Sequence, residues 1–521
     1  MSAILNLWLS QEAKSNVQQA IQAWKAKIGT DKVGIYPEQT EKYIQNITEY
    51  SAQKPIAVLK PKTRKDVEEI VAIARDFHVP LNPVSTGKNW GLGSKLPVTD
   101  GCILVIMSGL GKIIEVNQEL RYAIIEPGVT QKQLSDYLWN NTDLMFPMTG
   151  SAEDTSVVGN MLDRGSVFFD HRYDLLSGVE VVLGTGKVVR TGFWHYFDNI
   201  ENHQPKFFHP SGLGPDMNGI FTQSSLGIVT SIVIRLRPRR SGTIVYLEIK
   251  EDKVFNFIDT FNQLKDDKLV HNWLMLTNKN DPRTTDNHQF NYTGNWSAIG
   301  SFHGKKEIQD ICKKHIQEQL QGLCNPLNFL SSDLEESTEH PYFTILKKLY
   351  NGIPSNYSIE TMGNLSRSLS IKSDGLSLAD LDYEIDYCRE IPGFVTVTPA
   401  IPLTSGAFKE AINLVNRVSK DFDITPFHNF VSLGEMSVEG LFRVFFNRSN
   451  KEEIIKAHRW SRILYEEFEK IGIYPYRISV KDMQKFVNRK EDTYWKAIAD
   501  IKNQLDPSNI IAPGKFCLEN I

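Results

Sequence analysis

The chain has 521 residues, which is long enough for more than one domain with a substantial core. Hydrophobic residues make up 41% of the chain and charged residues 23%, a balance that argues against a disordered, fibrous or membrane-spanning protein. The 58 basic and 62 acidic residues give a net charge of −4, and without a basic excess or stripe we expect no nucleic-acid partner.

The apolar runs and the cysteines exclude further classes. The longest apolar runs, such as 103–107 and 179–183, are too short to cross a bilayer, and the first residues lack the basic region of a secretory signal. We therefore expect a cytoplasmic protein with no membrane contact. The five cysteines are scattered and form no C-x-x-C pair, which excludes a disulfide framework and a simple zinc module, so no metal is expected.

The first half of the chain mixes strands and helices. Thr63 and Asp66 form a capping-box pattern, and apolar residues follow at helical spacing to Phe77. A second helix is expected to open after Thr130 and to run to about Trp139. Extended or strand-like segments lie at 79–84, 102–107, 122–125, 179–183, 187–190 and 227–236. The Gly-Thr-Gly at 184–186 predicts a hairpin.

The composition shifts after residue 240, where strands begin to alternate with long helices up to about residue 475. This alternation in a separate block indicates an α+β second domain. The predicted strands lie at 243–249, 296–302, 393–400 and 442–446, and the predicted helices at 308–320, 407–419 and 452–471. A last helix at 495–505 leads into a polar turn, DPSNIIAPGK, at 506–515.

The glycine-rich turn at 85–94, STGKNWGLGS, carries the strongest local signal. Its glycines allow the backbone to approach a ligand, and N–H groups exposed there can bind a pyrophosphate. The spacing G-x-x-x-G-x-G is neither the dinucleotide fingerprint nor a Walker A loop, so a plain turn remains the alternative. A second segment, 156–165, suits backbone packed against a flat ring, or a structural loop. A third, 214–230, is a polar turn that leads into a buried strand.

Taken together and in order, these segments resemble the flavoprotein family typified by vanillyl-alcohol oxidase and the flavin subunit of p-cresol methylhydroxylase. The matching segments are STGKNWGLGS, EPGVT, VGNMLDRG, GVEVVLGTGKVVRTG, NGIFTQSSLGIVT, the Tyr476-Arg477 pair and DPSNIIAPGK. The resemblance covers roughly residues 50–240 and 440–521 and is faint across the segment between them.

The resemblance implies an α+β protein in two parts. An FAD-binding domain of the p-cresol methylhydroxylase type would comprise 1–240, with its core at about 50–240, and the C-terminal segment 476–521 would return to it. A cap domain, 241–475, would cover the flavin ring. The residues expected to bind FAD are Thr86, Gly87, Lys88, Asn89, Trp90, Gly91, Gly93, Ser94, Gly128, Ser151, Gly159, Asn160, Gly165, Gly227, Ile228, Val229, Arg477, Asn509 and Lys515.

In the family, a hydride passes from the benzylic carbon of a para-substituted phenol to the flavin, and a quinone methide results. The phenol is held as an anion by two tyrosines and an arginine. Tyr476 and Arg477 match two of these positions, whereas Leu92 stands where the second tyrosine is expected and makes the clamp more apolar. The candidate bases are Asp154, Glu384 and His428.

The family's flavin attachment points are not matched. The early loop holds no histidine, Phe394 stands at the later histidine spacing, and Tyr387 lies about one residue out of register with a tyrosine position. We therefore expect FAD to be bound without a covalent link, with Tyr387 as the one candidate for attachment.

Two alternatives to phenol oxidation stay open at this point. Hydride removal beside a carboxylate-bearing carbon would release CO₂, which is an oxidative decarboxylation. A protein that kept the scaffold but lost the flavin would only bind ligands. The resemblance also implies a small aryl substrate, O₂ or a redox protein as electron acceptor, and a homodimer.

Overall fold

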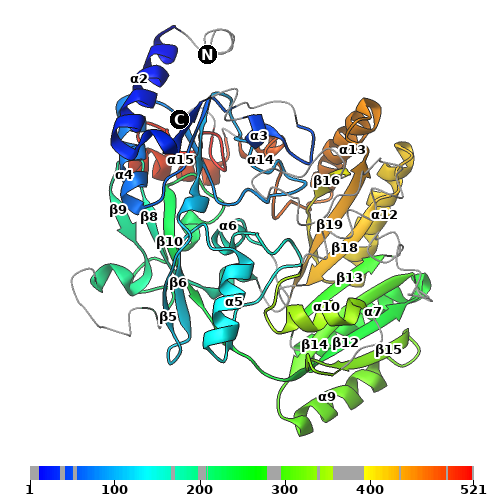
Figure 1. Cartoon of the computed structure of the whole chain (residues 1–521). Helices are drawn as coiled ribbons and strands as arrows, with labels where there is room; N and C mark the ends of the chain where they lie inside the picture. The colour runs from blue at the N-terminus through cyan, green and yellow to red at the C-terminus, as the bar shows by residue number, and fades with distance from the viewer. Residues whose placement is uncertain are drawn as a thin grey trace.

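The computed structural model describes residues 11–35, 41–50, 55–165, 171–197, 207, 209–270, 272–278, 295–336, 341–355, 392–432, 436–488 and 491–518. Within these residues the strands form three larger sheets and one two-stranded pair. Figure 1 shows the N-terminal half and the red C-terminal segment together in one lobe. The green-to-orange strands between them form a second lobe.

The first lobe begins with a four-stranded sheet in the order β1-β2-β4-β3. Its strands are β1 (Val33–Ile35), β2 (Ala57–Leu59), β3 (Leu81–Val84) and β4 (Ile103–Ile106). Beside it lie helices α2 (Gln11–Ile28), α3 (Glu41–Ile44) and α4 (Arg64–Asp76). Helix α4 begins where Thr63 and Asp66 form the predicted capping box, and the apolar stripe of the helix is buried with that of α2.

A five-stranded antiparallel sheet follows, in the order β5-β6-β10-β8-β9. Its strands are β5 (Ile113–Asn117), β6 (Tyr122–Ile125), β8 (Leu176–Val182), β9 (Val188–Arg190) and β10 (Ile228–Arg235). The predicted hairpin is confirmed as the β8–β9 pair. Helix α5 (Gln131–Asn141) begins at a Thr130 capping box, and the short helix α6 (Val157–Leu162) follows it. A small pair joins β7 (Leu144–Met145) to β11 (Arg237–Pro238).

The second lobe is built on an eight-stranded sheet in the order β15-β12-β14-β13-β18-β19-β16, with β17 paired to β19. Its strands are β12 (Gly242–Ile249), β13 (Asn272–Asn278), β14 (Trp296–His303), β15 (Cys324–Ser331), β16 (Gly393–Val397), β17 (Ala400–Pro402), β18 (Phe427–Ser432) and β19 (Ser437–Phe446). The helices are α7 (Val254–Asp266), α9 (Lys306–Gln319), α10 (Pro341–Tyr350), α12 (Ser405–Asp421) and α13 (Lys451–Lys470).

The two faces of this sheet have different neighbours. Helices α7, α9, α12 and α13 share one apolar core with the sheet. Helix α10 instead belongs to a second core, which it shares with the five-stranded sheet and helix α5 of the first lobe. The second face therefore packs toward the first lobe, as Figure 1 shows.

The C-terminal segment returns to the first lobe through α14 (Met483–Val487) and α15 (Thr493–Leu505). Leu81 of β3 exchanges two backbone hydrogen bonds of 2.7 Å with the segment, donating to the Ile510 carbonyl and accepting from the Ala512 N–H. Lys502 and Asp506 form an ion pair that is fully buried beneath it. The closing segment is thus fixed to the sheet that starts the chain.

The predicted elements differ from the structure mainly in extent. The predicted strand 393–400 is divided into β16 and β17, and β19 begins at Ser437 rather than at residue 442. The segment 156–165 contains helix α6. Sequence reasoning did not identify α2, α7, α10, β13, β15 or β18.

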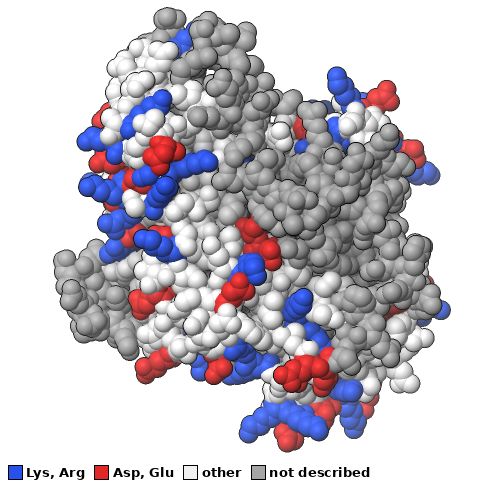
Figure 2. All heavy atoms as spheres, in the orientation of Figure 1, with Lys and Arg blue, Asp and Glu red and all other residues white. Residues whose placement is uncertain are grey.

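Among the described residues, charged groups of both signs are intermixed on the face that Figure 2 shows. None of the helices in the described part of the chain is long and apolar enough to cross a lipid bilayer. Within the same residues, no group of three or more His, Cys, Asp or Glu side chains is arranged to hold a metal ion.

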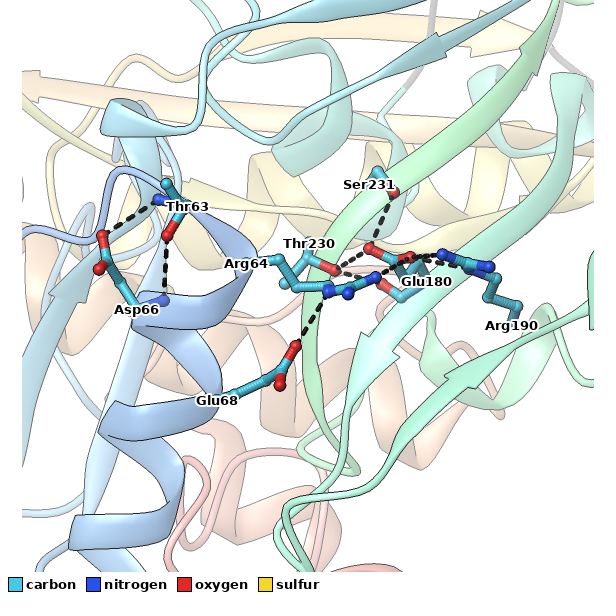
Figure 3. A network of polar contacts seen from close by, with 8 residues as sticks. All are labelled: Thr63, Arg64, Asp66, Glu68, Glu180, Arg190, Thr230 and Ser231. Carbon is cyan, nitrogen blue, oxygen red and sulfur yellow. Dashed lines mark hydrogen bonds and ion pairs between the residues drawn. The ribbon is translucent and has the colours of Figure 1, made fainter. Parts of the chain in front are cut away.

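Glu180 of β8 joins α4 to the five-stranded sheet. Its Oε2 accepts hydrogen bonds from Arg64 Nη1 at 3.1 Å and Arg190 Nε at 2.8 Å, and its Oε1 accepts one from Thr230 Oγ1 at 2.8 Å. Figure 3 shows the carboxylate between the two guanidinium groups. The side chain is only 7% exposed, so solvent screens these interactions weakly.

We expect Glu180→Gln to lower the free energy of unfolding by about 1.5–3 kcal/mol, because it removes charge-assisted hydrogen bonds while keeping the shape of the side chain. The matched control is Glu68→Gln, which removes an exposed ion pair to the same Arg64 and should cost about 0.5 kcal/mol. Denaturant unfolding of the two variants decides the matter. Equal losses would show that the Glu180 network contributes no more than a surface pair.

Candidate active site

A cavity lies where the glycine-rich loop, helix α6, the segment before β10 and two C-terminal segments meet. Its lining residues fall within 82–98, 155–163, 221–229, 477–483 and 515–516, with Met107 and Pro127 completing the wall. These segments are those that carry the sequence motifs. The fold therefore brings motifs that are separated by hundreds of residues to one site.

Most of the residues expected to bind the cofactor line this cavity. They are Thr86, Gly87, Lys88, Asn89, Ser94, Gly159, Asn160, Gly227, Ile228, Val229, Arg477 and Lys515. The cavity lining does not include Trp90, Gly91, Gly93, Gly128, Ser151, Gly165 or Asn509. These seven residues therefore lie outside the cavity wall.

Two of those glycines join the loop to other parts of the chain. Gly91 and Gly93 have φ angles of 76° and 114°, which favour glycine. A Cβ on Gly91 would lie 2.4 Å from Thr396 Oγ1 of β16, and one on Gly93 would lie 2.4 Å from Val480 Cγ2. Both glycines thus permit close packing of the loop against the second lobe and the C-terminal segment. Leu92 between them is buried and does not line the cavity.

The loop offers donors suited to a phosphate. The backbone N–H groups of Gly87 and Asn89 make no hydrogen bond to any described group. The Ser94 hydroxyl, which also lines the cavity, is buried and has no partner among the described residues. Free N–H groups in a glycine-rich turn form an anion-binding concavity, so these residues fit the pyrophosphate of FAD.

Positive side chains surround the cavity. Lys88 forms an ion pair of 2.9 Å with Asp154, and its side chain is only 2% exposed. Burial lowers the pKa of Lys515, and the Asp163 carboxylate opposes that shift. Asp154 was expected to act as a base, but the structure pairs it with Lys88, so it orients a loop cation.

Arg477 is held by two residues from distant segments. Its Nε donates to Asp163 Oδ2 at 3.0 Å and its Nη2 donates to Asn89 Oδ1 at 2.7 Å. Although burial disfavours the charged guanidinium, the Asp163 carboxylate raises the pKa of Arg477. Arg477 is therefore charged, and Asp163 already balances that charge. Sequence reasoning did not select Asp163, although it is the acidic position of the VGNMLDRG motif.

Two hydrogen bonds fix the backbone of Tyr476. The Tyr476 N–H donates to the Thr398 carbonyl at 3.0 Å, and Gln223 Nε2 donates to the Tyr476 carbonyl at 2.8 Å. Burial, followed by the charge of Glu439 and a hydrogen bond to its side chain, raises the pKa of Tyr476 well above its ordinary value. The phenol is thus neutral and interacts with Glu439, a residue that sequence reasoning did not select.

The register of β18 and β19 shows which side chains lie on each face of the eight-stranded sheet. His428 pairs with Phe442, whose side chain lies in the helix-covered core, whereas Val431 pairs with Glu439 and Phe427 with Arg443. Because side chains alternate along a strand, His428 points away from the face that carries Glu439 and Arg443. The structure therefore does not bring His428 to the cavity. Glu384 and Tyr387 lie outside the described residues.

His428 instead makes the protein sensitive to acid. Burial lowers its pKa from 6.5 to about 3, and neither ring nitrogen has a partner among the described residues. The unfolded chain binds a proton at His428 more readily than the folded chain does. The free energy of unfolding is therefore unaffected by this group above pH 6.5 and decreases as the pH falls from 6.5 toward 3.

At pH 5 we expect the free energy of unfolding to be lower by about 2 kcal/mol than above pH 6.5. Each pH unit below the pKa of the unfolded chain lowers it by about 1.4 kcal/mol. His428→Phe suits the aromatic neighbours Trp296 and Phe442 and should remove this dependence. Thermal midpoints of both proteins at pH 7.5 and pH 5 provide the comparison. An equal drop in the two proteins would show that His428 does not titrate on unfolding.

The face toward the first lobe carries a group of polar residues, which we call the polar sheet face: Thr277, Thr396, Asn429, Glu439 and Arg443. Asn429 Nδ2 donates to Thr277 Oγ1 at 3.1 Å, while Asn429 Oδ1 and Thr396 Oγ1 are buried without a partner among the described residues. Buried polar atoms without partners are costly in a closed core and suit the wall of a ligand site.

Comparisons with known proteins identify flavoproteins that are similar to this chain. A family model described as an FAD binding domain matches residues 55–192. The chain is 27% identical to 1'-carboxy-chondrochloren decarboxylase of Chondromyces crocatus, over 96% of this chain and 97% of that protein. It is 24% identical to the 4-cresol dehydrogenase [hydroxylating] flavoprotein subunit of Pseudomonas putida, over 95% of each.

Two solved structures share the fold. The structure of p-cresol methylhydroxylase with substrate bound matches with a TM-score of 0.83 and 22% identity, over 98% of both chains. A 4-ethylphenol oxidase from Gulosibacter chungangensis matches with a TM-score of 0.82 and 21% identity, over 98% of both chains. The predicted α+β fold is confirmed, and so is FAD as the cofactor.

Proposed function

Because the chain belongs to the p-cresol methylhydroxylase-type FAD-binding flavoproteins and is a flavin-dependent enzyme, we propose that it oxidises a para-substituted phenol or a related aryl compound. The bound FAD would supply the acceptor for a hydride leaving the benzylic carbon. The observation that carries this proposal is the Tyr476-Arg477 pair, which joins the cavity to the polar sheet face.

The chain's own residues would divide the work. The N–H groups of Gly87 and Asn89, with Lys88, would bind the pyrophosphate. Arg477, fixed by Asp163, would hold positive charge beside the reacting groups, where oriented charges stabilise developing negative charge best. Tyr476 would orient the substrate hydroxyl.

Anaerobic reduction of the flavin tests this proposal. Purified protein is mixed with 4-alkylphenols, 4-hydroxybenzyl alcohols and aryl-substituted acids, and bleaching of the flavin bands is followed. Rapid bleaching by a phenol or aryl alcohol is the expected result. A flavin that no member of the panel reduces would overturn the proposal, and a protein that takes up no FAD would favour a ligand-binding role. Admission of O₂ afterwards distinguishes an oxidase from an enzyme that needs a redox protein.

Oxidative decarboxylation of an aryl-substituted acid is the second candidate. The specific observation in its favour is the decarboxylase relative, which aligns over 96% of this chain. The guanidinium of Arg443 on the polar sheet face would suit a substrate carboxylate. Release of one CO₂ for each flavin reduced separates this reaction from oxidation without carbon loss.

We further propose that the FAD is held without a covalent bond. Phe394 at the family's histidine position is buried against Phe445 and cannot carry a flavin. Acid precipitation should release all of the flavin into the supernatant. Yellow colour in the precipitate, with a modified peptide that contains Tyr387, would contradict this expectation.

The arrangement of domains and chains is also a proposal. We propose an FAD-binding domain at 1–240, a cap at 241–475 and a returning segment at 476–521. We also propose that the chain forms a homodimer, which light scattering tests directly.

A further inference from the structure

We propose that Glu439 accepts the substrate's proton through the Tyr476 phenol, so that the site binds a neutral hydroxyl compound rather than a preformed anion. This inference rests on the proposed function and specifies the protonation state in which the substrate enters the site. No part of it depends on which para substituent the substrate carries.

The position of Glu439 supports the proposal. It lies on β19 near one end of the second lobe's sheet, between Val431 of β18 and Ala400 of β17, and is only 5% exposed. The Tyr476 N–H donates to the Thr398 carbonyl at 3.0 Å, two residues before Ala400, and this places Tyr476 beside the strand that pairs with Glu439. The Glu439 side chain acts on the Tyr476 phenol from there. A carboxylate in such a place is a strong hydrogen-bond acceptor with little water to compete for it.

Three basic side chains of the described residues lie near Glu439 and Tyr476: His171, Arg443 and Arg477. His171 Nδ1 lies 3.6 Å from Glu439 Oε1, and burial lowers the pKa of His171, so the imidazole is neutral at pH 7. Arg443 lies on the same sheet face, and Arg477 follows Tyr476 in the chain. Both guanidinium groups act on the Tyr476 phenol, and Glu439 acts on Arg477 in turn.

These contacts disfavour entry of an anion. Asp163 already balances Arg477, and the Glu439 carboxylate acts on the Tyr476 phenol. A phenolate would bring a second negative charge close to the carboxylate, which opposes binding. A neutral hydroxyl group meets no such repulsion.

The proton transfer then balances. As the substrate O–H gives its proton to the Tyr476 oxygen, Tyr476 gives its own proton to the Glu439 carboxylate. The substrate keeps the electron pair of the broken O–H bond, which helps the hydride to leave the benzylic carbon for FAD, the oxidant. The result is an oxidised, neutral substrate and a protonated Glu439, with Tyr476 unchanged.

The test is the pH profile of anaerobic flavin reduction in the holoenzyme, using a phenol that reduces the wild type. We expect Glu439→Gln to slow reduction about 100-fold at pH 7. Its rate should rise about tenfold per pH unit toward the pKa of the phenol, because only ionised substrate reacts, whereas the wild-type rate stays level. Glu439→Asp should keep a level profile.

The matched control is Glu248→Gln, which replaces another buried carboxylate of the same sheet that also accepts a hydrogen bond from a tyrosine, Tyr246, but lies outside the polar sheet face. This variant should change neither rate nor profile by more than about threefold. Flavin content is measured for each variant. A wild-type rate in Glu439→Gln, or a slow rate with a level profile, would overturn the inference, since a merely structural role gives the latter. If no phenol reduces the wild type, the proposed function itself fails.

Discussion

Lys502→Met is expected to lower the free energy of unfolding by about 3–5 kcal/mol, because it leaves a buried charge without its partner. The ammonium group donates to Asp506 Oδ2 at 2.6 Å and to the carbonyls of Ser225 and Ile511 at 2.6 and 2.7 Å. Neither side chain of the ion pair is exposed. Thermal unfolding of the holo-protein measures the loss.

Two further variants distinguish the effect of the buried charge from the effect of replacing any lysine in helix α15. Lys496→Met replaces a half-exposed lysine on the same helix α15 and should change stability by less than about 0.5 kcal/mol. Lys502→Met with Asp506→Asn removes both charges and should recover part of the loss. If Lys502→Met unfolds at the same midpoint as Lys496→Met, the buried pair contributes no stability.

The same pair has a consequence for the cofactor site. Ser225 lies in the segment that leads to Gly227, and the segment from Ile511 leads to Lys515, both of which line the cavity. Lys502 thus ties two walls of the cavity together from outside it. We expect the variant to bind FAD more weakly as well.

Features with local causes were predictable from the sequence. Capping residues at Thr63 and Thr130 define helix starts through contacts only three residues away, and both helices begin where predicted. The glycine-rich loop was found for a related reason, since a glycine pattern is visible without knowledge of its neighbours.

Features that depend on register or distant pairing were not predictable. The segment 427–432 mixes polar and apolar residues without a clear alternation, so β18 and its two faces were missed, and His428 was selected although it faces the core. Asp163 and Arg477 are 314 residues apart, and their pairing emerges only from the fold. Glu439 was not selected as a site residue because the predicted strand began after it.

Arg477→Met is expected to slow anaerobic flavin reduction about ten- to a hundredfold, because a charge-assisted hydrogen bond contributes about 1.5–3 kcal/mol and 1.4 kcal/mol is tenfold in rate. The loss has two parts. A positive charge beside the reacting groups disappears, and Asp163, whose side chain is 26% exposed, keeps a negative charge without its partner.

Two companion variants separate these parts. Asp163→Asn with Arg477→Met removes the uncompensated carboxylate, so any rate it recovers measures the harm done by Asp163 alone. Arg477→Lys keeps the charge, but a single ammonium cannot reproduce the fork that bonds Asp163 and Asn89, so its rate should fall between those of the wild type and Arg477→Met. Rapid-reaction reduction rates with FAD content measured in parallel decide the outcome. If Arg477→Met with full FAD is reduced as fast as the wild type, the guanidinium has no part in the chemical step.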